Sequence, residues 1–252
     1  SLAVLMLYEE GRFLLTDPIS KYIPTFADAK VIAPGSENFD GAGDPPMVKP
    51  ETPVTIRHLL LHTAGLSYGT GVQGRLYRSG GVFDMMAPEH TVGEFAQAIG
   101  RMPLLFQPGT KYQYSLSDDV LGYLVEVASG IPFEKFLEER IFKPLGMNDT
   151  FFYVPDSKTG RIAEVYRRNE SGRLEKQPPE PKRLAKPSER RFCGGGGGLY
   201  STVGDYARFC RMLLNGGELD GVRLLGRKSV ELMTTNHIGG FFNYVRGRGY
   251  GY

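Results

Sequence analysis

The sequence predicts a helix-rich α+β fold, and three observations support this assignment. Several segments carry apolar residues at helical spacing and are bounded by capping residues or glycine. Short strand-like segments follow Met147, with a polar turn between them. The sequence contains no internal repeat, which argues against a solenoid or a propeller.

Composition limits the classes of function. The 252 residues are 41% hydrophobic, which is enough to build a sizeable core. The net charge of +2 gives no field that would favour nucleic acid. The longest apolar run, Leu2 to Tyr8, is far shorter than the ~20 residues that span a bilayer. We therefore expect neither a nucleic-acid nor a membrane partner.

Cysteines and histidines offer little metal or redox chemistry. The only two cysteines, Cys193 and Cys210, are too few for a disulfide framework. His58 and His62 have the i, i+4 spacing of metal ligands, but a third ligand and an intervening glutamate are lacking. We expect no metal and no cofactor.

Besides a turn into a short helix at residues 14–19, three helices are predicted in the first hundred residues. The segment 2–8 is apolar around its whole circumference, as in a buried helix, and a glycine follows it. Thr55 caps a short apolar helix over 56–62. Thr91, with a glutamate three residues later, forms a capping box that opens a helix over 92–100.

The middle of the chain changes from helices to short strands. Apolar residues at helical spacing predict one helix over 118–130 and a second over 132–143, which ends before a proline. Beyond them, 150–154 and 162–167 are candidate strands, with a turn at Ser171-Gly172.

A glycine run precedes the last helices. Residues 194–198 permit very close backbone approach, but they lack the Gly-Lys-Ser/Thr ending of a phosphate loop. Thr202 then caps a helix with Asp205. Residues 220–221 predict a tight turn, and 229–234 predict a short helix.

Tyr114 is the strongest candidate for catalysis. The pair 108–109 marks a turn, residues 111–114 are predicted to be extended, and Ser115 with Asp118 has the spacing of a capping box. The tyrosine therefore precedes the positive end of a helix, where it could act as a base.

A tyrosine base near neutral pH needs a neighbouring cation. The pKa of a phenol is near ~10, so it must fall by about three, which corresponds to about 4 kcal/mol, whereas a helix terminus supplies only ~0.3–1 kcal/mol. Lys111 is a poor source, since three residues along an extended segment place it on the opposite face from Tyr114. The cation must come from elsewhere in the protein.

Two further motifs have the wrong context. Gly65 to Gly69 matches the Gly-x-Ser-x-Gly nucleophile elbow, but the segment before it is predicted to be helical, so Ser67 is only an alternative nucleophile. Lys158-Thr159-Gly160 matches the triplet of penicillin-recognising enzymes, but it lies in turn composition rather than on a strand. We interpret it as a chance match.

Several motifs occur in a characteristic order over nearly the whole chain. They are Leu60-Leu61-His62-Thr63-Ala64-Gly65-Leu66, Pro108-Gly109, Tyr114-Ser115, Asp119-Val120-Leu121-Gly122, Pro144-Leu145-Gly146-Met147 and Leu199-Tyr200-Ser201-Thr202 after the glycine run. With them the sequence resembles the serine β-lactamase-like superfamily, whose members include family VIII carboxylesterases, class C β-lactamases and penicillin-binding proteins. The resemblance implies a β-lactamase/transpeptidase-like fold, with a helical lobe and part of an antiparallel-sheet lobe.

The resemblance also implies an acyl-serine mechanism. Such enzymes use a serine and a lysine one helical turn apart, Ser-x-x-Lys, and a tyrosine that serves as general base and then acid, which Tyr114 matches. No Ser-x-x-Lys occurs from Ser1 to Tyr252, so we expect it just upstream, where its lysine would be the cation that Tyr114 needs. The strand that carries Lys-Thr-Gly or its substitute is expected beyond Tyr252. Residues 1–252 should thus form a single β-lactamase-like domain that is incomplete at both termini and inactive alone.

Leu116 bears on the substrate. The β-lactamases of the superfamily have asparagine two residues after the tyrosine, whereas leucine cannot bond a substrate amide. With Ser115 and Leu116 as substrate contacts, we expect hydrolysis of small-molecule carboxylic esters. A β-lactamase or D-peptidase, or a non-catalytic binding homologue, are the alternatives. The oligomeric state and the localisation stay open, with the cytoplasm slightly favoured.

Overall fold

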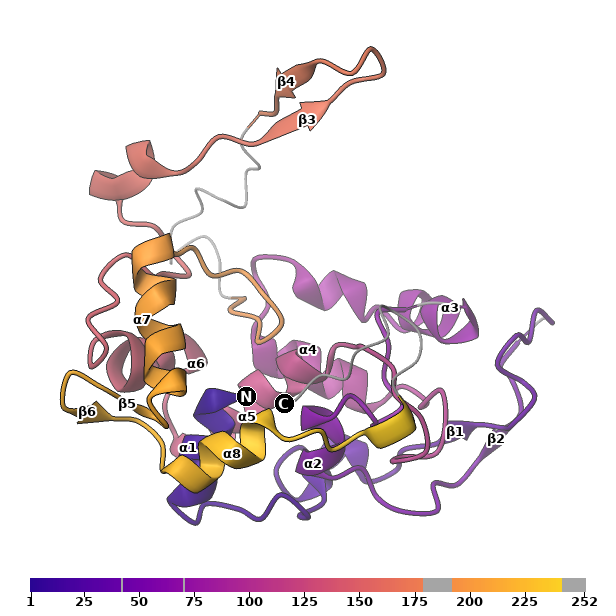
Figure 1. The fold of residues 1–252 in the computed structure, drawn as a ribbon. Helices are drawn as coiled ribbons and strands as arrows, with labels where there is room; N and C mark the ends of the chain where they lie inside the picture. Colours follow the sequence, from indigo (N-terminus) through magenta and orange to yellow (C-terminus); the bar gives the residue numbers. More distant parts are fainter. Residues whose placement is uncertain (42, 70, 179–191, 242–252) are drawn as a thin grey trace.

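Helices make up most of the structure. The computed structural model describes residues 1–41, 43–69, 71–178 and 192–241 (Figure 1). The α-helices are α1 (Leu2–Glu9), α2 (Ile56–Leu60), α3 (Gly71–Ser79), α4 (Val92–Gly100), α5 (Ser117–Ser129), α6 (Phe133–Leu137), α7 (Val203–Leu214) and α8 (Arg227–Thr234). Shorter helical turns are η1 (Ile19–Lys21), η2 (Pro24–Phe26), η3 (Phe83–Met86), η4 (Glu138–Phe142), η5 (Asp156–Arg161) and η7 (Gly239–Phe241).

The strands form three antiparallel two-stranded ladders among the described residues. They are β1 (Val31–Ile32) with β2 (Met47–Val48), β3 (Tyr166–Arg168) with β4 (Leu174–Lys176), and β5 (Glu218–Leu219) with β6 (Val222–Arg223). The predicted turns at Ser171-Gly172 and Asp220-Gly221 lie between paired strands, as expected. Asp220 and Gly221 both have positive φ, +50° and +81°, as tight hairpin turns require.

Helix α5 lies at the centre of the helical part, and α1, α2, α4 and α6 all contact it (Figure 1). It buries Val120, Leu121, Leu124 and Val125 on one apolar stripe. Gly130 ends it in the left-handed conformation, φ +73°, which confirms the predicted C-terminal end. The core therefore surrounds the helix whose N-terminus follows Tyr114.

Helix α1 packs beside α5, and the N-terminus of the chain lies there (Figure 1). Every residue from Leu2 to Leu7 is buried. The sequence pattern, apolar on all sides, correctly predicted a buried helix.

Three threonine caps were predicted correctly. Thr55 and Thr91 each form a capping box with the residue three positions later. Thr202 accepts a hydrogen bond from the backbone N–H of Asp205.

Other boundaries were wrong. Residues 150–154 form only an isolated bridge between Phe151 and Tyr200, and the strand expected over 162–167 is confined to 166–168. The helix expected over 132–143 divides into α6 and the π-helical turn η4. For the two strand segments, long-range pairing decided how far the strand extends.

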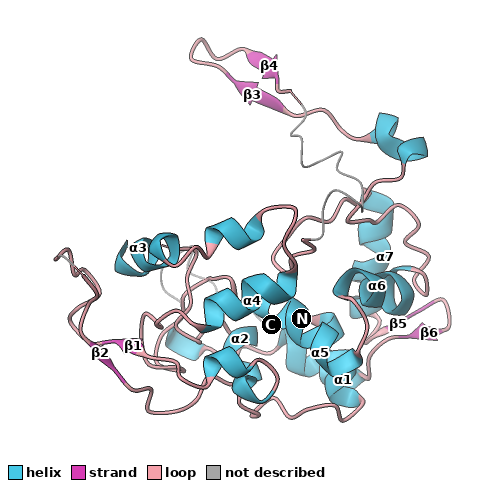
Figure 2. Ribbon diagram, turned by 180° about the vertical axis from the view of Figure 1, so that it is seen from behind, coloured by secondary structure: helices cyan, strands magenta, loops and turns pink. Residues whose placement is uncertain are grey.

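The β3–β4 hairpin projects away from the helices (Figure 2). All six of its strand residues are exposed. Among the described residues, no helix is both long and apolar enough to cross a membrane.

Candidate functional site

Backbone hydrogen bonds place Tyr114 beside the end of α2. The N–H of Gly109 donates to the carbonyl of Thr63 at 2.8 Å, and the N–H of Gln113 donates to the carbonyl of His62 at 2.9 Å. The segment 111–114, predicted to be extended, forms no strand but runs alongside these residues. Tyr114 therefore lies opposite His62.

Tyr114 is half-exposed and is held by two other rings. Its side chain is 52% exposed. The centroid of its ring lies 4.8 Å from that of His62 and 5.4 Å from that of Tyr68. Burial raises the pKa of Tyr68, and a hydrogen bond with Tyr114 acts in the same direction, so Tyr68 keeps its proton. Tyr114 is thus an accessible phenol in a constrained position.

Ser115 does not cap the helix as predicted. The N-cap of α5 is Leu116, which makes no side-chain capping bond. The Ser115 hydroxyl instead lies 2.8 Å from Ser117 Oγ and 3.2 Å from His62 Nδ1, and Asp118 Oδ2 lies 3.6 Å from His62 Nε2. Both members of the expected capping box are therefore turned toward His62.

Burial and the Asp118 carboxylate both act on His62. Its side chain is 14% exposed, and burial lowers its pKa, with Asp118 opposing this effect. The N-terminal end of α1 also lies near Asp118 and His62.

The glycine run packs against the first turn of α5, and its glycines allow the close backbone approach that the composition predicted. A Cβ on Gly195 would lie 1.9 Å from the backbone oxygen of Asp118, so no other residue fits there without movement. The N–H of Gly196 donates to Asp119 Oδ1 at 3.1 Å. Burial raises the pKa of Asp119 to about 6, against the hydrogen bonds from this loop.

Ser67 and Leu116 are both inside the protein. Ser67 is 0% exposed, accepts a hydrogen bond from the N–H of Gly69 at 3.0 Å, and follows helix α2 and a turn rather than a strand. Leu116 and Ser115 are each 1% exposed. Within the segment that matches the nucleophile elbow, the side chain that contacts Tyr114 is that of Tyr68, not that of Ser67.

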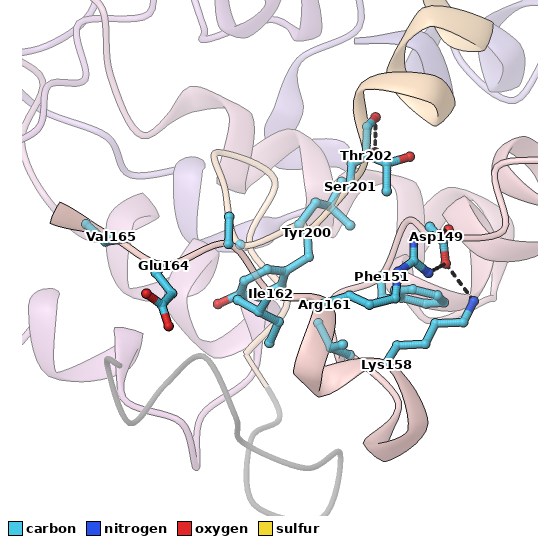
Figure 3. Close-up of a pocket in the computed structure, with 14 residues that line it drawn as sticks. Asp149, Phe151, Lys158, Arg161, Ile162, Glu164, Val165, Tyr200, Ser201 and Thr202 are labelled. Carbon is cyan, nitrogen blue, oxygen red and sulfur yellow. Dashed lines mark hydrogen bonds and ion pairs between the residues drawn. The ribbon is translucent and has the colours of Figure 1, made fainter. Parts of the chain in front are cut away.

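Lys158 lies away from Tyr114, in another part of the structure. It lies in η5, where its ammonium group and the Arg161 guanidinium both bond Asp149, and hydrogen bonds from Arg161 and then Lys158 lower the pKa of Asp149 to about 2. These residues, with Phe151 and Tyr200, line a cavity of about 600 Å³ (Figure 3). None of its lining residues belongs to the cluster around Tyr114.

Lys111 is not the partner of Tyr114, as the sequence indicated. Its Nζ lies 3.8 Å from a carboxylate oxygen of Glu37. In the described ranges, no group of three or more histidine, cysteine or acidic residues could hold a metal ion.

His62, Tyr68 and Asp119 lie at the candidate site but were not predicted from the sequence. The i, i+4 spacing of His58 and His62 indicates only a possible metal pair, although His62 stands in one of the ordered motifs. Its contact with Ser115 spans 53 positions, and that of Asp119 with Gly196 spans 77, so no local pattern could reveal them.

Comparison with known proteins identifies the family. A sequence model of the Beta-lactamase family matches residues 1–252. Protein Rv1367c of Mycobacterium tuberculosis is 37% identical over 237 residues, 94% of this chain and 56% of that protein. Esterase EstB of Burkholderia gladioli is 33% identical over 229 residues, 82% of this chain and 52% of that protein.

Among solved structures, unliganded Simvastatin Synthase (LovD) from Aspergillus terreus, as its selenomethionyl derivative, superimposes with a TM-score of 0.74 and 28% identity. The alignment covers 94% of this chain and 56% of that protein. The chain thus spans about half the length of the relatives it matches. The resemblance and the β-lactamase/transpeptidase-like fold predicted from the motifs are confirmed: the chain belongs to the Beta-lactamase family.

Proposed function

We propose that this chain is part of an acyl-serine enzyme that hydrolyses small-molecule carboxylic esters, with Tyr114 as general base and acid. The observation that carries the proposal is the position of Tyr114, which is accessible, fixed by two neighbouring rings, and three residues before α5. The similarity to Esterase EstB supports the ester as substrate class.

The proposed nucleophile is a serine in the helical turns that precede Ser1, with a lysine one turn after it. Two observations support this proposal. The N-terminal end of α1 lies close to Asp118 and His62, so a further helical turn there, ~5.4 Å long, would lie beside Tyr114. The relatives also extend well beyond this chain.

In the proposed reaction, Tyr114 accepts the proton of the serine hydroxyl as the serine oxygen bonds the ester carbonyl carbon. The carbon–oxygen bond to the alcohol then breaks, and Tyr114 returns its proton to the departing alcohol. Water attacks the acyl-serine by the same route in reverse order, which releases the acid and restores the serine. The lysine ammonium would stabilise the phenolate during both steps.

Leu116 supports esters over amides. Its apolar side chain is buried and offers no hydrogen bond to a substrate amide. A preference for amides over esters that depended on this hydrogen bond is therefore lost. An ester, which has no N–H, requires no such group.

The test is a comparison of the intact protein with its Tyr114→Phe variant, on p-nitrophenyl butyrate and on nitrocefin. We expect faster turnover of the ester, and a loss of at least ~10² in kcat for the variant because the proton acceptor is removed. The matched control is Tyr206→Phe, at an exposed tyrosine on α7, which should retain turnover. Wild-type turnover by Tyr114→Phe would remove this residue from the mechanism. Faster nitrocefin turnover would instead favour a β-lactamase, and no turnover of either would favour a binding homologue.

Acyl transfer to an alcohol is a second candidate. The structural similarity to Simvastatin Synthase favours it, since a synthase forms a product bond. An acyl-serine can be attacked by an alcohol in place of water. When a primary alcohol is added to the ester assay, part of the butyryl group should be transferred to that alcohol in place of water. Chromatography measures the new ester that this transfer forms.

A further inference from the structure

We propose that His62 is a positioning residue for Tyr114. It contacts the residues just before and just after that tyrosine in the sequence, and these contacts fix the position of the tyrosine ring. The inference rests on the proposed function of Tyr114 and adds a second residue to it.

The backbone of His62 adopts a conformation that is uncommon for residues other than glycine. Its φ is +53°, in the left-handed region, where asparagine, aspartate and histidine occur more often than other non-glycine residues. Such a conformation persists only where the surroundings fix it, and these sites are frequently functional. Here the carbonyl of His62 accepts the N–H of Gln113 at 2.9 Å, which ties the strained residue directly to the segment before Tyr114.

The imidazole is anchored to the segment after Tyr114. Nδ1 lies 3.2 Å from Ser115 Oγ, and Nε2 lies 3.6 Å from Asp118 Oδ2. One proton arrangement satisfies the whole chain of contacts: Ser117 donates to Ser115, Ser115 donates to Nδ1, and Nε2–H points to the Asp118 carboxylate. The backbone and the side chain of His62 together therefore contact residues on either side of Tyr114, from Gln113 to Asp118.

Between these two attachments the imidazole meets the phenol. The rings of His62 and Tyr114 are 4.8 Å apart at an interplanar angle of 54°, and Tyr112 packs edge-on against the same imidazole at 6.1 Å. Ring pairs at these separations are attractive in tilted and edge-on arrangements. Proton transfer is sensitive to misplacement of about 1 Å, so a ring support of this kind matters for catalysis.

The surroundings of His62 favour a neutral support. The charged group is the Asp118 carboxylate on α5, and the phenols of Tyr112 and Tyr114 lie beside the ring. Burial lowers the pKa of His62, so near neutral pH the imidazole is uncharged and its Nδ1 remains free to accept from Ser115. His62 thus contributes geometry to Tyr114, and the cation is left to the proposed lysine.

A double-mutant cycle on the intact protein tests the proposal, with kcat for p-nitrophenyl butyrate as the readout. Asparagine at position 62 keeps the left-handed backbone and removes the ring. We expect His62→Asn to lower kcat by about 10- to 100-fold with KM changed less than about threefold. In the Tyr114→Phe background the same substitution should have almost no further effect, because the residue it positions is already disabled. His90→Asn, at a histidine on another surface, is the control and should retain wild-type kcat.

Effects that multiply in the double variant, or wild-type kcat for His62→Asn, would overturn the positioning role. Wild-type kcat for Tyr114→Phe is a different result, which would overturn the proposed function itself. If His62→Asn does not fold, Asp118→Asn provides the second test, because it loosens the anchor at Nε2 and leaves the ring in place. It should also lower kcat, and again only when Tyr114 is present.

Discussion

Asp119 is a carboxylate whose protonation is coupled to folding. It is 5% exposed, and burial raises its pKa to about 6 from an ordinary value of 3.8. The folded state therefore binds the proton more tightly than the unfolded state does. The stability that this proton contributes is fully present below about pH 3.8 and is lost as the pH rises through about 6.

Replacing Asp119 by asparagine should remove this pH dependence. The free energy of unfolding of Asp119→Asn, relative to the wild type, is expected to rise between pH 4 and pH 7 by up to about 3 kcal/mol, which follows from the shift in pKa. Denaturant melts of the intact protein at several pH values measure it. Asp44→Asn, at an exposed aspartate, is the control. A constant offset between Asp119→Asn and the wild type at every pH would contradict the coupling.

At the scale of elements, the glycine run and α5 form one unit. The two are in contact at Gly195, where a Cβ would lie 1.9 Å from the Asp118 carbonyl oxygen, whereas a Cβ on Gly197 would meet nothing within 4 Å. Gly195→Ala should therefore force the loop away from α5, at a cost of about 1–3 kcal/mol. We expect a melting temperature lower by about 2–10 °C and reduced ester turnover.

Gly197→Ala is the matched control, since it makes the same chemical change two residues away in open space. Its melting temperature and turnover should stay close to those of the wild type. Equal effects of the two substitutions would mean that loss of glycine flexibility, rather than contact with α5, limits this loop.

The elements also explain which sequence predictions succeeded. Thr91 caps α4 as predicted, because the capping box is satisfied by residues three positions apart. Ser115 has the same pattern with Asp118, yet the Ser115 hydroxyl lies within hydrogen-bond distance of His62 Nδ1 and the Asp118 carboxylate lies 3.6 Å from Nε2. A distant histidine competes successfully for these groups, and its position could not be inferred from the local sequence.

At the scale of the whole molecule, the fold class and the family were predictable because each ordered motif is local. Gly130 and the apolar stripe of α5 define a helix by themselves, and Tyr114 stands in a recognisable segment. The site was only partly predictable, because His62 and the glycine run reach Tyr114 and α5 through tertiary contacts. Tyr114 could therefore be predicted as a candidate from its local sequence, whereas the residues that contact it could not.

The location of the acyl group on the molecule distinguishes the two possible nucleophiles. Ser67 is 0% exposed and bonds the Gly69 N–H, so attack from this serine would require its loop to open. We expect Ser67→Ala to keep ester turnover within about twofold of the wild type. Mass spectrometry of the intact protein, quenched with acid during turnover of p-nitrophenyl butyrate and then digested, should place the butyryl group on a serine before α1. A butyryl group on the peptide that contains Ser67, together with inactivity of Ser67→Ala, would identify Ser67 as the nucleophile. This result would contradict the proposed serine and lysine before Ser1.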